Sequence, residues 1–188
     1  MVLSKLVNLL FQTAWLFLPA WIANMTPILI TKLNLFPRLA GPIDGGKKWK
    51  GKRIFGQNKT WRGLICGVAT GLIFICLQRY LYFHSEIVRK ISIFNYAGSD
   101  YWLVGIFLGF GALSGDMIES LVKRQKNIAP GQSWRPWDQI DQAIGSAILV
   151  SFIFQPPLAI YVLLLLITFL GVMAINLLAC RLGIKKDL

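Results

Sequence analysis

The sequence contains few histidine, cysteine and acidic residues. It holds one histidine, three cysteines, and eight acidic residues against 20 Lys and Arg. The single histidine, His84, lies at the expected end of a helix and is given no catalytic role. No Ser-His-Asp set is available either. Cys66, Cys76 and Cys180 lie in apolar segments without metal-ligand spacing, so neither disulfides nor zinc are expected. The phosphate-binding pattern G-x-x-x-x-G-K-[ST] is also missing. The chemistry therefore has to come from carboxylates and cationic side chains.

Apolar residues, in contrast, are abundant. They make up 55% of the 188 residues, and the mean hydropathy is +0.58. Soluble domains contain roughly 45–50% apolar residues, so a soluble chain of this length could not bury the excess. The first apolar stretch is longer than a signal-peptide core and has no small-residue cleavage site after it, so no cleaved signal is expected. The composition predicts an all-α integral membrane protein that forms one domain, residues 1–188.

Five segments approach the length of about 20 apolar residues that a membrane span requires. The predicted spans are residues 6–30, 61–83, 101–120, 140–154 and 158–182. The fourth is the shortest, and Gln155-Pro156-Pro157 separates it from the fifth. Small residues at four-residue spacing allow helix backbones to approach closely in lipid. They occur in the second and third spans, at Gly63, Gly67, Gly71, Gly105, Gly109, Gly111 and Gly115.

The basic residues are distributed unevenly between the connecting segments. Most of them lie in the loops 31–60 and 121–139, at the start of the second span, or in the C-terminal tail; those expected on the other side are Lys5, Arg79, Arg89 and Lys90. The positive-inside rule then places both loops and the C-terminus in the cytoplasm and the N-terminus outside. In a chain mostly within membrane, this charge favours the bilayer surface and phosphate ligands, and not nucleic acid, as partners.

The third predicted span ends in a polar helix face. Asp116, Glu119, Ser120 and Lys123 follow the spacing i, i+3, i+4 and i+7, so they share one face. A salt-bridge ladder at the membrane interface is an alternative explanation. However, Asp116 lies too deep in the apolar run to be a solvated end charge, and a charge at membrane depth needs a partner or a function.

Two more carboxylates, Asp138 and Asp141, lie one turn apart where the fourth span begins. Favourable interaction with the helix dipole explains Asp138 better than Asp141, which enters the membrane. Together with Asp116, they give three carboxylates from two helices. Mg²⁺ prefers such oxygen ligands combined with substrate phosphates, so these three residues are the predicted magnesium ligands.

The loop before the second span contains further candidate residues for phosphate binding. Asn58, Lys59, Thr60 and Arg62 lie at a loop-to-helix junction, where phosphate binds well. Attraction to anionic headgroups also explains the basic run 47–53, but it does not explain this Asn-Lys-Thr-Trp-Arg sequence. Carboxylates for a divalent metal and cations for phosphates together favour phosphoryl or nucleotidyl transfer.

Three motifs, in this order, resemble the CDP-archaeol synthase family, which is itself similar to the CDP-diacylglycerol synthases. The first motif runs from Pro42-Ile43-Asp44-Gly45-Gly46 through 51–56 to 58–63. The second contains Gly115-Asp116, Ser120, Lys123-Arg124 and Pro130-Gly131, and the third is Pro136-Trp137-Asp138-Gln139-Ile140-Asp141.

The resemblance implies an enzyme that converts CTP and a lipid phosphate, with Mg²⁺, to CDP-lipid and pyrophosphate. The lipid would be an archaeal ether-lipid phosphate or a phosphatidate-like lipid, and the preference for CTP rests on the resemblance alone. Glu119 stands where many members carry a basic or neutral residue, so the resemblance gives it no role. The implied catalytic residues are Asp116, Lys123, Asp138 and Asp141. The implied substrate-binding residues are Asp44, Asn58, Lys59, Thr60, Arg62, Ser120 and Arg124.

Two alternatives fit the sequence less well. A CDP-alcohol phosphotransferase would carry an Asp-Gly-x-x-Ala-Arg run, which this chain lacks. A non-catalytic transporter or lipid-binding membrane protein would favour internal repeats and helices broken at mid-membrane. Here the polar residues instead gather at one face of the membrane.

Overall fold

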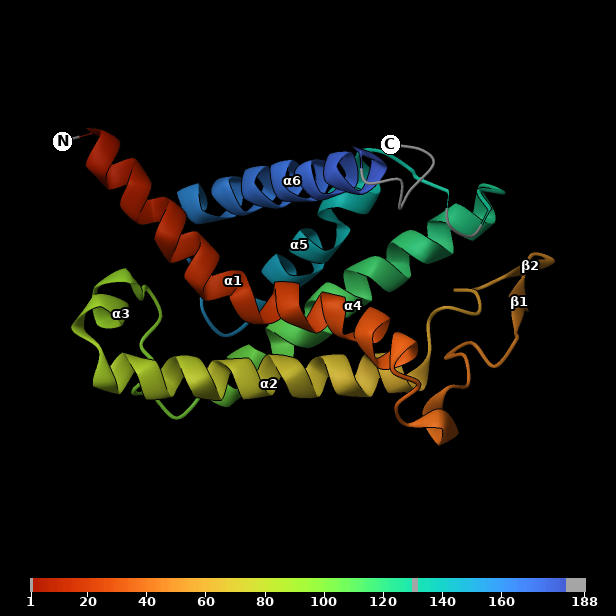
Figure 1. Cartoon of the computed structure of the whole chain (residues 1–188), viewed down its shortest axis with the longest axis horizontal. Coiled ribbons are helices and arrows are strands. Elements are labelled where there is room, and N and C mark those ends of the chain that lie inside the picture. Colours follow the sequence, from red (N-terminus) through yellow and green to blue (C-terminus); the bar gives the residue numbers. More distant parts are fainter. Residues whose placement is uncertain (1, 130–131, 182–188) are drawn as a thin grey trace.

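The computed structural model describes residues 2–129 and 132–181, and this part of the chain is almost entirely helical (Figure 1). A two-stranded antiparallel hairpin and one 3₁₀ turn interrupt the helices between α1 and α2. The helices are α1 (Val2–Lys32), α2 (Trp61–His84), α3 (Glu86–Ile91), α4 (Tyr101–Gln125), α5 (Trp137–Val150) and α6 (Leu158–Arg181). The short elements are η1 (Pro37–Leu39), β1 (Lys48–Trp49) and β2 (Lys52–Arg53). The predicted all-α class is confirmed.

Four helices are long and apolar enough to cross a membrane. They include residues Leu3–Lys32, Trp61–His84, Tyr101–Gln125 and Leu158–Leu178. The fourth predicted segment is also helical, as α5, but it has only 14 residues. At 1.5 Å per residue it is about 21 Å long, less than the hydrocarbon core of about 30 Å. The five predicted spans therefore comprise four long helices and one short helix.

The helices α1, α4 and α6 run toward one end of the bundle, and α2 and the short α5 run back from it (Figure 1). The α1–α2 connection, with its hairpin, lies at the same end as the α4–α5 connection and the last turn of α6. The start of α1 and the short α3 lie at the opposite end. The two basic loops therefore share one end of the bundle, as a common site requires. That this end faces the cytoplasm remains a prediction.

Glycines allow α1, α2 and α4 to pack closely. A Cβ atom added to Gly71 would lie 2.8 Å from the carbonyl oxygen of Gly105 on α4. One added to Gly67 would lie 2.6 Å from the Leu113 side chain and 2.9 Å from the carbonyl oxygen of Ala23 on α1. Real Cβ atoms do not approach neighbours this closely, so the packing predicted from the glycine spacing is confirmed.

The contact between α4 and α5 is closer still and positions the polar site. A Cβ on Gly111 would lie 2.6 Å from the carbonyl oxygen of Gly145, and a Cβ on Gly115 would collide with the backbone carbonyl of Asp141. The two backbones therefore touch beside the acidic residues. In addition, α4 continues to Gln125, beyond the predicted end of the span near residue 120, so Lys123 and Arg124 lie on the same rigid helix as Asp116.

Candidate active site

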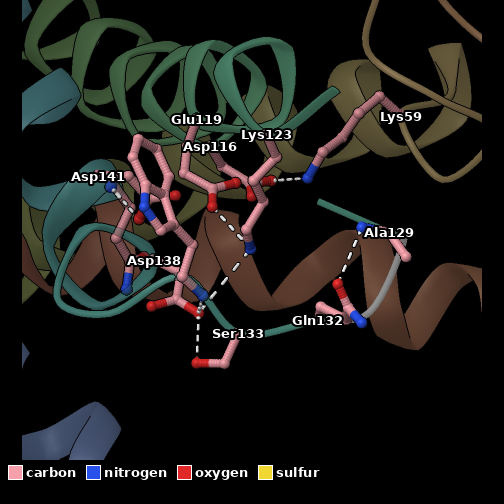
Figure 2. A network of polar contacts seen from close by, with 11 residues as sticks. Lys59, Asp116, Glu119, Lys123, Ala129, Gln132, Ser133, Asp138 and Asp141 are labelled. Atoms are coloured by element: carbon pink, nitrogen blue, oxygen red, sulfur yellow. Dashed lines mark hydrogen bonds and ion pairs between the residues drawn. The ribbon is translucent and has the colours of Figure 1, made fainter. Parts of the chain in front are cut away.

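Three carboxylates from two helices meet at the end of the bundle that carries the basic loops (Figure 2). Asp116 and Glu119 come from adjacent turns of α4, and Asp141 comes from α5. One oxygen from each lies within 4.8 Å of the others. The close backbone contact at Gly115 is what brings the α5 carboxylate into this group.

Asp138, one of the predicted metal ligands, is not a member of this carboxylate cluster. Its Oδ2 accepts hydrogen bonds from the Ser133 hydroxyl and the Trp134 backbone N–H, both at 3.0 Å. The same oxygen lies 3.8 Å from Nζ of Lys123. Asp138 thus holds the turn that enters α5, while Glu119 completes the cluster. The i, i+3 spacing from Asp116 was the sequence signal for Glu119.

Two lysines, one on α4 itself and one in the loop before α2, pair with the α4 carboxylates. Lys123 places Nζ 2.7 Å from Glu119 Oε1, and both side chains are nearly inaccessible to solvent. Lys59 forms an ion pair with Asp116, 57 residues away in sequence (Figure 2). The site thus combines three carboxylates with two ammonium groups. Because these negative and positive side chains nearly balance, the site can accept a further divalent cation together with an anion.

Lys59 is positioned by the start of α2. Thr60 is the N-cap residue, and its hydroxyl accepts a hydrogen bond from the N–H of Gly63 at 3.3 Å. The backbone on either side of Thr60 is fixed to the start of the loop, because the N–H of Ile43 donates to the carbonyl of Lys59 at 2.8 Å and a β-bridge joins Pro42 to Thr60. The predicted phosphate-binding junction is therefore a capped helix N-terminus, with the Lys59 side chain directed toward Asp116.

Asp44 organises the same loop from within. Its side chain has no exposed surface, and Oδ1 lies 2.7 Å from Nη2 of Arg53. The backbone N–H groups of Gly46, Phe55 and Gly56 also donate to the carboxylate, at 3.0–3.1 Å. Burial alone would raise the pKa of Asp44, but these hydrogen bonds outweigh it and hold the pKa below the usual range. Both oxygens of the Asp44 carboxylate accept hydrogen bonds from groups within the loop. These contacts favour a positioning role for Asp44 over direct contact with substrate.

A cavity of about 460 Å³ opens beside the carboxylates, and basic side chains outnumber acidic ones in its lining. Its charged lining includes Arg53, Lys59, Lys123, Arg124, Asp116 and Glu119. The hairpin forms one wall, and it is tied to the end of α4 because Lys52 Nζ donates to the carbonyl of Gln125 at 2.6 Å. Ser120 and Arg124, both predicted substrate-binding residues, line this cavity.

A second cavity, of about 520 Å³, lies between α1, α2 and α4. It combines apolar side chains with Thr60 and Arg62, two further predicted substrate-binding residues. Asn58, Lys59 and Asp116 line both cavities. The structure thus divides the predicted binding residues between two adjoining spaces that meet at the Lys59–Asp116 pair. Pro130 and Gly131, and the tail lysines Lys185 and Lys186, lie outside the described residues.

Fold and site together define an integral membrane enzyme that acts on phosphate groups at one end of a helix bundle. The profile of the CarS-like CDP-archaeol synthase family matches residues 6–188. A CDP-archaeol synthase of Methanococcus maripaludis is 34% identical over 96% of this chain and 97% of its own length. One from Pyrococcus furiosus is 31% identical over 94% of this chain and 96% of its own length.

A solved structure agrees with these sequence relatives. It is described as an intramembrane enzyme for archaeal membrane lipids biosynthesis, and it superposes with a TM-score of 0.65 at 26% identity. The match covers 87% of this chain and 92% of that one. The chain belongs to the CDP-archaeol synthase family. It is a membrane cytidylyltransferase that makes a CDP-lipid.

Proposed function

We propose that the two adjoining cavities hold the two substrates and that the reaction occurs at their boundary. The basic cavity takes the triphosphate of CTP, and the cavity between α1, α2 and α4 takes the phosphate end of the lipid. The observation that carries this proposal is that Lys59 and Asp116 line both spaces. A lipid phosphate beside Arg62 and a triphosphate beside Lys123 and Arg124 would therefore meet at one place.

The carboxylate cluster has the chemistry of a Mg²⁺ site. It offers carboxylate oxygens from Asp116, Glu119 and Asp141 and no thiolate or imidazole, and Mg²⁺ prefers oxygen ligands shared with substrate phosphates. When bound, Mg²⁺ would neutralise charge on the reacting phosphates. We assign these three residues as its ligands, with Glu119 in the place that the sequence analysis gave to Asp138.

The remaining residues bind and orient the two phosphates. An oxygen of the lipid phosphate attacks the α-phosphorus of CTP, a new P–O bond forms, and the bond to the β-phosphate oxygen breaks, so that pyrophosphate leaves. Reactions of this class depend on charge neutralisation and in-line positioning more than on a protein nucleophile. Lys59, Lys123 and Arg124 supply positive charge, and Asn58, Thr60 and Ser120 supply hydrogen bonds. Asp138 acts through Lys123, because its carboxylate lies on the far side of that ammonium group.

The lipid substrate is proposed to be an ether-lipid phosphate of the archaeal type, and the site is proposed to face the cytoplasm. The first part is supported by the names of the relatives and the second by the basic loops that surround the site. The test is to incubate purified protein with labelled CTP, Mg²⁺ and a panel of ether- and ester-linked lipid phosphates. We expect labelled CDP-lipid, fastest with the ether lipid, and none after chelation of divalent metal. Equal rates with all the lipids would contradict the assignment of substrate, and turnover after chelation would contradict the metal site.

A further inference from the structure

The α1 helix carries an amide that lines one of the two cavities and that the proposed reaction does not use. Asn24 lines the cavity between α1, α2 and α4, and it has no hydrogen-bond partner among residues 2–129 and 132–181. It lies eight residues before Lys32 at the end of the helix, which is about 12 Å deeper at 1.5 Å per residue. This amide is therefore well below the level of the charged loops.

Asn24 lies at the inner end of the cavity. The neighbouring Ala23 is fully buried, and its carbonyl packs against Gly67 of α2, which also touches Leu113 of α4. This three-helix contact lies at Ala23, one residue further from the charged end of α1 than Asn24. The surrounding lining is apolar and includes Pro27, Ile28, Leu64, Leu113 and Met117. The Asn24 amide is thus a polar group among mostly apolar side chains in this part of the cavity.

A purely structural role for Asn24 would require a partner on another helix. Polar side chains in membrane helices commonly join helices through hydrogen bonds. Gln78 does so here, donating to the Trp15 carbonyl at 2.5 Å and accepting from the Tyr96 hydroxyl at 3.3 Å. Asn24 makes no such bond among the described residues. The Asn24 side chain is partly exposed and lines the cavity, so its amide is free to bond to a ligand there, and at membrane depth a polar group gains from such a partner.

We propose that Asn24 donates a hydrogen bond to a linkage oxygen of the glycerol backbone of the lipid substrate. The inference rests on the proposed function, which places the lipid phosphate near Lys59 and Arg62 at the outer end of this cavity. In a glycerol lipid, the next polar atoms beyond the phosphate are the ether or ester oxygens that carry the chains. A simple alkyl phosphate has only methylene groups there. Asn24 is thus a specificity residue that distinguishes glycerol-based lipid phosphates from alkyl phosphates.

The test compares two lipid phosphates of equal chain length, a glycerol diether phosphate and an alkyl phosphate, with wild type, Asn24→Leu and Asn24→Gln. For Asn24→Leu we expect kcat/KM for the diether phosphate to fall about two- to twelvefold, the value of one hydrogen bond. Turnover of the alkyl phosphate and the KM for CTP should not change. Asn24→Gln keeps the amide and should recover part of the loss. Met25→Leu is the matched control, because Met25 is adjacent on α1 and 58% exposed on the outer surface.

A second measurement separates failure of this inference from failure of the proposed function. Binding of each lipid phosphate without CTP is followed by the shift in melting temperature of the detergent-solubilised protein. Weaker binding of the diether phosphate alone to Asn24→Leu supports the role of Asn24. Equal weakening for both lipids, or none for the diether phosphate, overturns it. If wild type binds the lipid but makes no CDP-lipid, the proposed function fails, while the binding comparison still decides the role of Asn24.

Discussion

The ammonium group of Lys123 lies 2.7 Å from the carboxylate of Glu119 on the preceding turn of α4. The same nitrogen lies 3.8 Å from Asp138 at the start of α5. Lys123 therefore links a member of the carboxylate cluster to a residue outside it (Figure 2). Glu119 and Asp138 therefore make different contacts, and for this reason we propose different roles for them, although the sequence places both beside the site.

The first prediction separates these two roles. Asp141→Asn and Glu119→Gln each remove an oxygen ligand, so each should lower kcat by more than about 100-fold. Asp138→Asn removes no cluster ligand and weakens only the support of Lys123 and of the turn before α5, so it should cost about 10–100-fold. Initial rates over a range of Mg²⁺ concentrations provide the measurement. A severe loss with Asp138→Asn and near-normal activity with Glu119→Gln would instead favour the ligand set Asp116, Asp138 and Asp141.

The second prediction concerns the lysine shared by both cavities. Lys59→Ala removes charge-assisted hydrogen bonds worth about 1.5–3 kcal/mol. We therefore expect kcat/KM for CTP to fall by about 10- to 150-fold, at roughly 1.4 kcal/mol per decade. Lys47, exposed in the open part of the same loop, is the matched control. Lys47→Ala should cause a small loss that fades with added salt, since exposed charges are screened within about 10 Å at 0.1 M. Equal, salt-sensitive losses in both variants would mean that the loop attracts phosphate only diffusely.

The third prediction concerns the contact between α4 and α5. Gly115→Ala places a methyl group against the backbone of Asp141 and must push the two helices apart. We expect it to destabilise the protein by about 1–3 kcal/mol. Activity should fall by about 100-fold, because a shift of about 1 Å misplaces the carboxylates. Gly171→Ala on α6 is the control, since a Cβ there would meet nothing within 4 Å. Melting temperature and turnover are measured for both variants. If Gly115→Ala has normal activity, close backbone packing is not what assembles the site.

The fourth prediction concerns pH and the loop held by Asp44. The pKa of Asp44 is lower in the folded protein than its ordinary value of about 3.9, so this carboxylate contributes stability above the ordinary value. That stability is present above the ordinary pKa and is lost progressively as the pH falls from there through the lowered pKa. The backbone amides of residues 43–57 should therefore be equally protected against hydrogen exchange at pH 7 and pH 4.5, after correction for intrinsic exchange rates.

Asp44→Asn should remove this protection at both pH values, because Arg53 and the backbone N–H groups of Gly46, Phe55 and Gly56 lose their charged acceptor. Asp100→Asn is the control. Asp100 is exposed directly before α4, outside the loop 43–57, and the hydroxyl of Ser99 donates to it at 2.9 Å. If wild-type protection already declines between pH 7 and pH 4.5, the role of Asp44 in the loop is wrong.

The fifth prediction tests the orientation of the chain. Single cysteines are introduced at Lys50, Gln132 and Ser92 after the native Cys66, Cys76 and Cys180 are replaced. The first two positions lie in the basic loops at one end of the bundle, and Ser92 follows α3 at the other. A membrane-impermeant thiol reagent applied to intact cells should label only the Ser92 position. Labelling of the two loop positions from outside would place the site on the outer face.

The sequence by itself determined the membrane class, the positions of the long helices and the candidate residues. Hydropathy depends on each residue's own transfer free energy, so α1, α2, α4 and α6 can be read from composition along the chain. Glycine spacing predicted close helix contacts, since those contacts depend only on which face of a helix lacks side chains. The polar face through Asp116, Glu119 and Lys123 likewise follows from the 3.6-residue period.

Only the tertiary structure decided which carboxylates meet and how the loop residues divide between two cavities. Asp138 and Asp141 lie one turn apart on α5, and the sequence analysis predicted both as metal ligands. The direction in which α5 crosses α4 at Gly115 turns Asp141 toward Glu119 and leaves Asp138 beside Ser133. A crossing angle is set by contacts between residues far apart in sequence, and no local pattern encodes it.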